Sequence, residues 1–274
     1  MADRKQPQGA KAQMDQSSMG DLQIGIEVPV AYVKLNRPPL NVLDLKTIKA
    51  LSLALDIAIT EPGVGIIALS AAGEKAFSVG VDIKDHTPDK VGNMLDAFHS
   101  VFRKLIAAPQ VSVAAVKGYC LGGGCELATF CDVVLADEGA KFGVPEIDVG
   151  CYPPVAAAFY PMLIGDKRAN AMVLSGKPIG AAEAKAIGLI TDVAPAGQLD
   201  ALVSTWVDSL KSKSQSVLML TRRAMKKQKE KQFLDALDWA EKLYLEELVK
   251  LDDMHEGLAA FLEKRKPVWR SLPR

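Results

Sequence analysis

The chain has 274 residues, 49% of them hydrophobic, and its 33 basic and 33 acidic residues give a formal net charge of zero at pH 7. A chain of this length can bury one large core. The balanced charge excludes a general electrostatic attraction to nucleic acid or to an anionic membrane surface. No apolar run approaches the roughly 20 residues that a membrane-spanning helix needs. We therefore expect a globular protein with no nucleic-acid or membrane partner, located in the cytoplasm.

The chain begins with a polar segment. Residues 1–20 contain no hydrophobic stretch and so are not a secretory signal. We expect a disordered tail here, with a cleaved organelle-targeting segment as the open alternative. Residues 22–35 show partial alternation of apolar side chains, which predicts two short strands that turn near Val28. Asp44 then precedes residues 45–59, where leucine and isoleucine recur at the spacing of a helix.

Strands and helices are expected to alternate through the next part of the chain. Continuous apolar runs of strand length occupy residues 65–71, 111–116 and 132–137. A helical pattern covers residues 91–107, and a short helix is expected after the glycines at 122–124. This order predicts an α/β core with parallel strands and crossover helices.

The character of the sequence changes after Val193. Residues 197–264 are almost entirely helical in pattern, and no Pro/Ser-rich linker separates them from the preceding segment. We therefore predict three parts: a disordered tail over residues 1–20, a core domain over residues 21–195 and a helical C-terminal region over residues 196–274.

The four cysteines lie close together in the chain, at Cys120, Cys125, Cys131 and Cys151. Their spacings match no usual pattern of zinc ligands. Buried reduced thiols are the ordinary interpretation in a cytoplasmic protein. We therefore predict no metal site.

Three glycines, Gly122, Gly123 and Gly124, run directly into Cys125 and Glu126. Glycines between a strand and a helix let the backbone approach a ligand and leave free N–H groups at the helix N-terminus. A phosphate-binding loop would need a following Lys-Ser/Thr pair, and the carboxylate would repel a phosphate. The free N–H groups suit an oxyanion that develops on a neutral carbonyl. A simple tight turn is the alternative.

A second acidic residue, Glu146, follows Glu126 by 20 positions and also lies among apolar residues, in FGVPEIDVG. Two carboxyl groups in apolar settings can have pKa values that are pushed apart, so that one holds a proton and the other does not. Such a pair can position a water, remove its proton and protonate a carbon. Either glutamate alone is as well explained by a helix cap or a surface position.

A third stretch, EKAFSVGVDIKDH, covers residues 74–86 and follows an expected strand. Gly80, Val81 and Asp82 lie where this strand gives way to a loop. A loop amide at this point can supply a second hydrogen-bond donor to an oxyanion. A connecting turn without a function is the alternative.

Together these stretches closely resemble the crotonase superfamily, which is the enoyl-CoA hydratase/isomerase family. The resembling segments are AFSVGVDIK, YCLGGGCELATFCD and FGVPEIDVG, with NRPPLNVLD before them and EGLAAFLEKRKP after them. The resemblance runs from about Gly20 to Trp269. It implies a ββα spiral catalytic core with a helical C-terminal trimerisation region, and a homotrimer or dimer of trimers. It also implies an acyl-CoA thioester substrate, with no cofactor beyond the CoA that is part of that substrate.

The resemblance assigns roles to individual residues as well. It implies an oxyanion hole made by the backbone amides of Val81 and Gly123, and a pair of acids at Glu126 and Glu146. The presence of both acids favours hydration of a double bond conjugated to the thioester, in which water adds at carbon 3 and carbon 2 receives a proton. Further substrate-binding positions are expected at Asp82, Ile83, Lys84 and Gly122. Phe261 and Lys264 match positions that help to enclose the adenine end of CoA, often from a neighbouring subunit, and an interface helix is the alternative for them.

Residues 151–165, CYPPVAAAFYPMLIG, depart from the family pattern. The family commonly has a Gly-rich turn and a Thr-x-Arg-Leu helix start here, whereas this chain has two prolines and lacks the arginine. We expect this segment to shape the acyl pocket, because it follows Glu146 closely. The residues expected to form the pocket are Tyr152, Pro154 and Ala157, with room left by Ala156–Ala158 and flat apolar surfaces at Phe159 and Tyr160. The segment is most similar to family members that hydrate cyclohexa-1,5-diene-1-carbonyl-CoA in anaerobic benzoyl-CoA degradation, and a bulky ring suits these features better than a linear chain.

Several alternatives stay open at this point. The basic run in residues 222–231 is expected to be a solvated helix face, but it is also compatible with RNA binding by a crotonase-fold protein. His86, His99 and His255 lack partners at catalytic spacings and are expected to have structural or surface roles. The other enzymatic candidates are a general enoyl-CoA hydratase of fatty-acid oxidation, an enoyl-CoA isomerase and a ring-opening acyl-CoA hydrolase.

Overall fold

The computed structural model of the protein describes residues 15–270. Its larger sheet has seven strands in the order β1-β2-β3-β4-β6-β8-β11. β1 and β2 pair antiparallel, as do β2 and β3, and the pairs from β3 to β11 are parallel. The strands are β1 Asp15–Ser18, β2 Leu22–Glu27, β3 Val30–Leu35, β4 Ile66–Ala71, β6 Val111–Val116, β8 Val133–Asp137 and β11 Asp192–Ala194.

A smaller sheet of four strands has the order β10-β9-β7-β5. Its strands are β5 Ala76–Ser78, β7 Tyr119–Leu121, β9 Lys141–Gly143 and β10 Ile179–Gly180. β5, β7 and β9 are parallel neighbours, and each follows directly on a strand of the larger sheet. The chain therefore repeats a strand–strand–helix unit three times, and the segments after β5, β7 and β9 leave the small sheet at the same edge.

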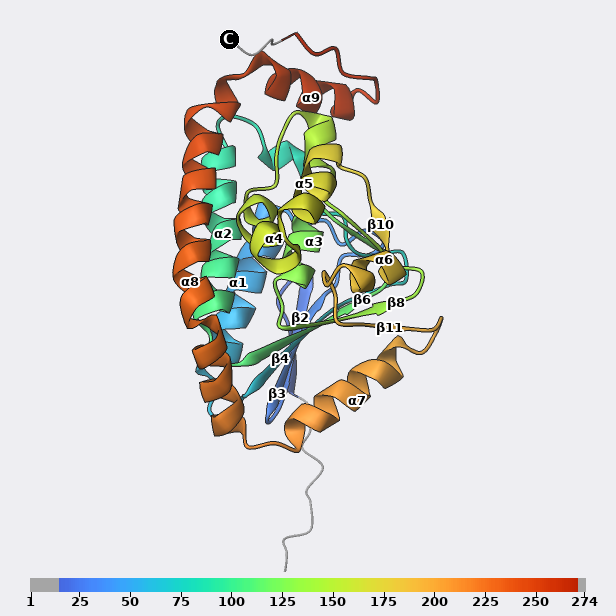
Figure 1. Ribbon diagram of the computed structural model, residues 1–274, viewed down its shortest axis with the longest axis vertical. Helices are drawn as coiled ribbons and strands as arrows, with labels where there is room; N and C mark the ends of the chain where they lie inside the picture. Colours follow the sequence, from blue (N-terminus) through green and yellow to red (C-terminus); the bar gives the residue numbers. More distant parts are fainter. Residues whose placement is uncertain (1–14, 271–274) are drawn as a thin grey trace, which may run out of the picture.

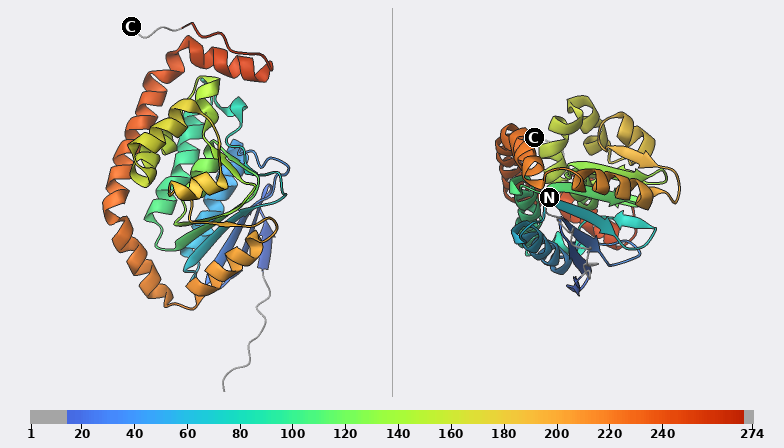
Figure 2. Two further views of the ribbon diagram at one scale, coloured as in Figure 1. Left: turned by 45° about the vertical axis from the view of Figure 1, so that its right-hand side comes forward. Right: turned by 90° about the horizontal axis from the view of Figure 1, so that it is seen from below.

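Helices cover both faces of the larger sheet (Figure 1). The long α8 runs along one side of the molecule beside α2 and α1, whereas α7 packs across the opposite face against Val30, Ile66 and Leu135 (Figure 2). The α-helices are α1 Leu45–Thr60, α2 Val91–Ala107, α3 Gly123–Thr129, α4 Pro154–Ile164, α5 Asp166–Ser175, α6 Ala181–Ala186, α7 Leu199–Lys211, α8 Gln215–Glu246 and α9 Asp252–Leu262. Three 3₁₀ turns complete the structure: η1 Ile83–Asp85, η2 Pro145–Val149 and η3 Leu248–Lys250.

The elements predicted over residues 22–137 are confirmed, and so is the helical character of residues 197–264. Asp44 caps α1 as expected, because its side chain accepts a hydrogen bond of 2.8 Å from the Thr47 amide. The predicted tail is different in part: residues 15–18 form β1 against β2, while residues 1–14 lie outside the described residues. The four cysteines are buried free thiols, as predicted.

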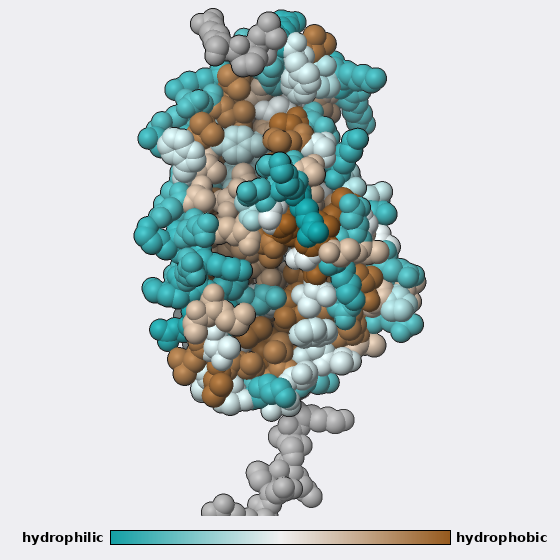
Figure 3. Space-filling model, in the orientation of Figure 1, coloured by the Kyte–Doolittle hydropathy of each residue, from teal (hydrophilic) through white to brown (hydrophobic). Residues whose placement is uncertain are grey.

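The C-terminal helices share the core of the strand-rich part rather than forming a separate unit. Phe233, Leu237 and Tyr244 of α8 are all at most 1% exposed and belong to the same apolar cluster as the strands and α2. Within residues 15–270, no helix combines the length and apolar character needed to cross a membrane. At the start of α8, Val217 and Leu220 are exposed, and Figure 3 shows apolar surface at this end of the molecule. The oligomeric state stays a prediction.

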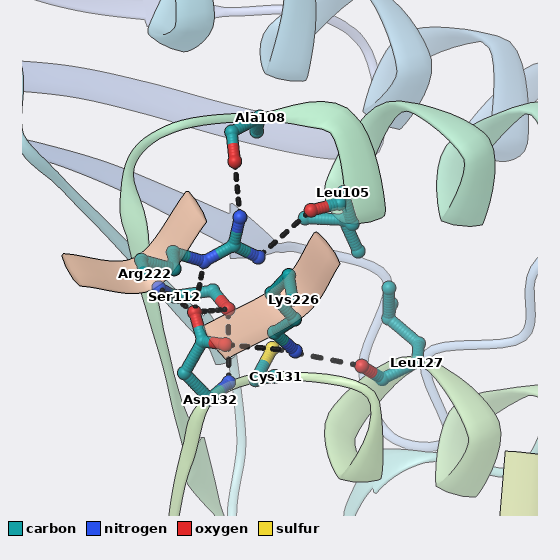
Figure 4. A network of polar contacts seen from close by, with 8 residues as sticks. All are labelled: Leu105, Ala108, Ser112, Leu127, Cys131, Asp132, Arg222 and Lys226. Atoms are coloured by element: carbon teal, nitrogen blue, oxygen red, sulfur yellow. Dashed lines mark hydrogen bonds and ion pairs between the residues drawn. The ribbon is translucent and has the colours of Figure 1, made fainter. Parts of the chain in front are cut away.

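A buried ion pair fastens α8 to the sheet (Figure 4). Arg222 Nε lies 2.6 Å from the carboxylate of Asp132, the residue that precedes β8, and Lys226 Nζ lies 2.9 Å from the same group. The backbone amide and the hydroxyl of Ser112 each donate to Asp132 Oδ2 over 2.9 Å. Burial opposes ionisation of Asp132, but the charges of Lys226 and Arg222 outweigh it and hold the pKa of this carboxyl below its usual value.

The same arginine also joins α8 to the end of α2. Arg222 is only 6% exposed, and its guanidinium donates to the carbonyl oxygens of Leu105 and Ala108. The basic run at residues 222–231 is therefore not simply a solvated face, because Arg222 and Lys226 are committed to Asp132. This removes two of its cations from any RNA-binding surface.

We predict that Arg222→Met and Asp132→Asn each lower the free energy of unfolding by about 3–5 kcal/mol, because each leaves a buried charged partner unpaired. Urea denaturation measures this change. Lys231→Met is the control, since the Lys231–Asp235 pair is exposed and such pairs contribute at most about 1 kcal/mol. A loss below about 1 kcal/mol in both test variants would show that the pair does not hold α8 in place.

Candidate active site

A cavity of about 440 Å³ lies where the segments after β5, β7 and β9 meet. Its wall combines the loop before η1, the first residues of α3, η2 and the segment that leads into α4. Residues of α2, the end of α8 and the end of α9 complete it. Both predicted acids and both predicted amide-bearing residues line this one cavity, although they come from three separate units of the chain.

The first acid, Glu126, is a residue of α3, and its side chain is bound at the N-terminus of α4. Its side chain is buried, with 2% of the residue exposed, and its Oε1 accepts a hydrogen bond of 2.7 Å from the Ala156 amide. Pro154 is the first residue of α4, where a proline suits the helix start and where the amides lack intrahelical acceptors. Burial raises the pKa of Glu126 from 4.5 to about 7. Hydrogen bonds from the amides of Ala156 and Val155 favour the carboxylate and so partly offset this rise.

The second acid, Glu146, has hydrogen-bond support from its own backbone amide rather than from the amides of another helix. Its Oε2 is buried and has no hydrogen-bond partner among the described residues, even though the residue as a whole is partly exposed. Burial, and after it the charge of Glu126, raises the pKa of Glu146 well above its usual value. The proton shared by this pair therefore belongs mainly to Glu146, while Glu126 ionises more readily.

The backbone of Gly122 makes room for Glu146. A Cβ at this position would lie 2.7 Å from Glu146 Oε1, and the φ of Gly122 is +53°. Any L side chain here would be strained and would also displace the carboxyl group. The first of the three glycines is thus required by the second acid, which lies far along the chain.

The amide of Val81 points away from its backbone neighbours. Leu43 donates to the carbonyl of Gly80 and accepts from the amide of Asp82, at 2.9 and 3.1 Å. In a parallel bridge bonded in this way, the N–H of the middle residue faces away from the partner strand. The Gly80 amide is also satisfied, by Ser78 Oγ at 3.1 Å. Val81 lines the cavity, so its N–H is available there.

The amide of Gly123 is the second available donor. Gly123 is the first residue of α3, so its N–H is one of those with no acceptor inside the helix. A Cβ at Gly80 would lie 3.1 Å from the nitrogen of Gly123, which shows how closely the two loops approach. A Cβ at Gly123 would come within 2.8 Å of Phe98 and 3.0 Å of Val81. Replacing Gly123 would therefore disturb packing as well as any bound carbonyl.

The arrangement can stabilise negative charge on an oxygen and move protons beside it. The residues that carry the two available N–H groups come from adjacent loops, and two carboxyl groups with raised pKa values line the same cavity. These are the elements that enolate chemistry requires: an oxyanion hole, a base and an acid. Within the described residues, no group of three or more His, Cys, Asp or Glu side chains is placed to hold a metal ion.

Most of the predicted substrate-binding positions line the cavity. They are Val81, Asp82, Ile83, Lys84, Gly122, Gly123, Tyr152, Pro154 and Phe261. Lys264 does not line it; it lies beyond the end of α9 and is exposed, with φ of +54°.

The prediction for Ala157 is wrong. Its side chain is exposed, because it lies on the outer side of α4 while Ala156 and Ala158 face the core. Phe159 and Tyr160 also lie outside the cavity wall. Phe159 packs on Phe130 and Phe233, with ring centroids 4.7 and 5.9 Å apart. The Tyr160 hydroxyl lies 3.1 Å from the Thr129 hydroxyl. These two side chains therefore pack in the core beside α3 and α8 rather than forming an acyl pocket.

Sequence reasoning missed part of the wall. His86 and His99, expected in structural or surface roles, line the cavity together with Met94, Leu95 and Tyr244. A ring nitrogen of His86 lies 3.1 Å from the Asp82 carbonyl oxygen, and burial lowers the pKa of this imidazole. His255 is exposed on α9, as expected. Met94, Leu95 and Phe98 share one buried face of α2, as the helical period indicates. Nothing in the sequence indicates that Tyr244 of α8 lies next to this face.

Comparisons with known proteins agree on one family. Residues 25–272 match the sequence model of the family described as enoyl-CoA hydratase/isomerase. The chain is 36% identical over 240 residues to the cyclohexa-1,5-dienecarbonyl-CoA hydratase of Thauera aromatica, which covers 87% of this chain and 92% of that protein. It is 34% identical over 241 residues to a probable enoyl-CoA hydratase of Mycobacterium bovis, covering 87% and 93% respectively.

A solved structure gives the same result for the fold. The crystal structure of an enoyl-CoA hydratase from Mycobacterium avium subsp. paratuberculosis superposes with a TM-score of 0.84 at 30% identity. The match covers 93% of this chain and 100% of that chain. The resemblance therefore extends over the whole architecture and is not limited to the glycine-rich motif.

The raised pKa of Glu126 predicts how stability depends on pH. Between pH 4.5 and about 7, the folded chain keeps a proton on Glu126 that the unfolded chain releases. The contribution of this proton to the unfolding free energy is therefore full below pH 4.5 and is lost as the pH rises from 4.5 to about 7. The loss is on the order of 3 kcal/mol, at about 1.4 kcal/mol for each pKa unit.

We expect Glu126→Gln to reduce the fall in unfolding free energy between about pH 5 and about pH 8, as measured by urea denaturation. Glu183→Gln, which changes an exposed glutamate of α6, is the control and should follow the wild-type curve. An equal fall in wild type and Glu126→Gln would contradict the proposed environment of Glu126.

Proposed function

This chain belongs to the enoyl-CoA hydratase/isomerase family, and on that premise we propose that Glu126, Glu146, Val81 and Gly123 carry out hydration of an enoyl-CoA thioester. The family and the α/β fold of the crotonase type are confirmed, and the chain is a hydro-lyase of the enoyl-CoA hydratase type. The observation that carries the assignment is the unequal environment of two buried acids beside two available amides.

In the proposed mechanism, the thioester oxygen lies between the amides of Val81 and Gly123. Negative charge that develops on this oxygen is stabilised by both N–H groups, and in other enzymes the loss of one such donor costs about 3–4 kcal/mol. The Glu126 carboxylate removes a proton from water as the hydroxyl adds to carbon 3. Glu146 then supplies its proton to carbon 2, and the enolate collapses to the hydroxyacyl thioester. The two pKa values support this division of roles.

The CoA part of the substrate is proposed to enter at the exposed end of the cavity. Lys84 is exposed there, and Phe261 of α9 is 57% exposed although it lines the cavity. The cavity wall also includes side chains of α2 that are at most 3% exposed, among them Met94 and Leu95. The acyl group would therefore point inward, between α2 and α8.

For the acyl group, we propose an alicyclic dienoyl thioester such as cyclohexa-1,5-diene-1-carbonyl-CoA. The relative from Thauera aromatica bears this activity in its name, and Tyr152, Pro153 and Pro154 give the cavity a stiff wall next to the acids. A general enoyl-CoA hydratase is the second candidate, because the Mycobacterium bovis relative is nearly as similar.

We predict that Glu126→Gln and Glu146→Gln each reduce hydration of the preferred enoyl-CoA by about 100- to 10,000-fold, as general acid–base groups do. Steady-state kcat, together with a circular dichroism spectrum of each variant, measures the effect. Incorporation of labelled oxygen from water separates hydration from isomerisation. Near-normal turnover in either variant, with chemistry limiting the rate, would sink the two-acid mechanism.

We expect wild type to hydrate the cyclic dienoyl thioester with a far higher kcat/KM than crotonyl-CoA, because atoms misplaced by about 1 Å can cost about 100-fold. Val149 lines the cavity, so Val149→Phe narrows the cavity and should lower kcat/KM for the cyclic substrate more than for the linear one. Ala157→Leu is the matched control, since this residue faces solvent. A wild-type preference for crotonyl-CoA would leave a general enoyl-CoA hydratase.

A further inference from the structure

The cavity wall contains two buried polar side chains that the proposed chemistry does not use. His99 of α2 and Tyr244 of α8 are each 1% exposed and both line the cavity. His99 Nε2 has no hydrogen-bond partner among residues 15–270, and the Tyr244 hydroxyl is paired only with the thiol of Cys151, a weak hydrogen-bonding group. Buried polar atoms are seldom left unpaired in native proteins, since each costs the desolvation of that group. An unpaired imidazole nitrogen and a weakly paired phenol in one cavity wall indicate a ligand that pairs with both.

The ring of His99 is fixed by an acidic residue of α8. His99 Nδ1 lies 2.9 Å from Glu241 Oε2, and Arg103 Nη2 lies 3.3 Å from the same oxygen. The hydrogen bond from His99 contributes most to a lowered pKa of Glu241. Because a carboxylate only accepts hydrogen bonds, Nδ1 carries a proton. With the ring proton on Nδ1, the lone pair lies at Nε2, so we assign the role of acceptor to the ring nitrogen in the cavity wall.

Tyr244 supplies the complementary donor. It follows Glu241 by one helical turn, so both side chains lie on the same face of α8. Its ring packs against Tyr152, with centroids 5.2 Å apart. Burial raises the pKa of Tyr244, which keeps the phenol protonated. The Tyr152 hydroxyl, in contrast, donates to the Ala240 carbonyl oxygen over 2.6 Å and is already satisfied.

We propose that His99 and Tyr244 bind a hydroxyl group at the end of the acyl moiety remote from the thioester. An alcohol donates one hydrogen bond and accepts others, so it pairs with an imidazole acceptor and a phenol donor together. A hydrocarbon end would leave His99 Nε2 unpaired and Tyr244 with the Cys151 thiol alone, and a carboxylate has no proton for Nε2. This refines the proposed function, on which it rests: the ring or chain that is hydrated carries an oxygen of its own, in addition to the one that water supplies.

Ligands without a reactive double bond test this separately from catalysis. We would measure the Kd of 4-hydroxycyclohexanecarbonyl-CoA against cyclohexanecarbonyl-CoA, and of 6-hydroxyhexanoyl-CoA against hexanoyl-CoA, by calorimetry. The two pairs differ only in the hydroxyl and cover both acyl shapes. We expect wild type to bind the hydroxylated member of at least one pair about tenfold more tightly.

Tyr244→Phe is the sharpest variant, because it removes a hydroxyl whose protein partner is only the weakly hydrogen-bonding thiol of Cys151. It should reduce the preference for the hydroxylated ligand several-fold, and His99→Leu should do the same. Tyr152→Phe is the matched control: the change is chemically identical and lies in the same wall, but the lost hydroxyl is bonded to backbone, so the preference should persist. The chain has only three histidines, so ¹⁵N spectra of histidine-labelled protein can follow His99 Nε2, whose resonance should move more with the hydroxylated ligand.

Equal Kd values within both pairs in wild type, or a preference that persists in both test variants, would overturn the proposal. Hydration assays run in parallel keep the two proposals distinct. Hydration without a hydroxyl preference would refute the role of His99 and Tyr244 alone. A hydroxyl preference without hydration of any enoyl thioester would support this site and refute the proposed reaction.

Discussion

Two carboxyl groups share one buried cavity, and the cost of ionising both there governs the rest of the site. Glu126 is offered two amide donors by the first turn of α4, whereas Glu146 has its own backbone amide and lies against Gly122 with one oxygen unpaired. The difference in support decides which acid gives up its proton first. A side chain at Gly122 would push Glu146 away, and a different start of α4 would remove the anion support of Glu126.

The position of α4 depends in turn on the long C-terminal helix. Phe159 on the inner side of α4 packs against Phe233 of α8, and α8 is fixed to the sheet by Arg222 and Asp132. Asp132 is the last residue of the segment 122–132, which begins with the three glycines and contains Glu126. One short stretch of sequence therefore supplies a proposed oxyanion donor, the proposed base and the anchor of the helix behind them. This connects the folding of the C-terminal region to the chemistry of the proposed active site.

The sequence predicts those features that are set by local chemistry. Glu126, Glu146 and the glycine run were noticed because each conflicts with an ordinary core, and the strand–helix alternation was predicted from its periodicity. The choice of Val81 and Gly123 as amide donors came from the family resemblance. The wrong and missed assignments concern residues whose positions depend on how the helices pack against one another. Ala157 was assigned to the pocket from proximity to Glu146, but the rotation of α4 about its axis, set by packing on α8, turns it outward. Tyr244 was missed because only the register of α8 against α2 brings it to the cavity.

The central claim is that, above the pKa of about 7 of Glu126, the proton of the pair resides on Glu146. Infrared difference spectroscopy of the carboxyl C=O stretch in the unliganded protein at about pH 8 tests it directly, because Glu126 is then mostly ionised. The account predicts a protonated-carboxyl band that is lost in Glu146→Gln and retained in Glu126→Gln. A band that is lost in Glu126→Gln and retained in Glu146→Gln would contradict it.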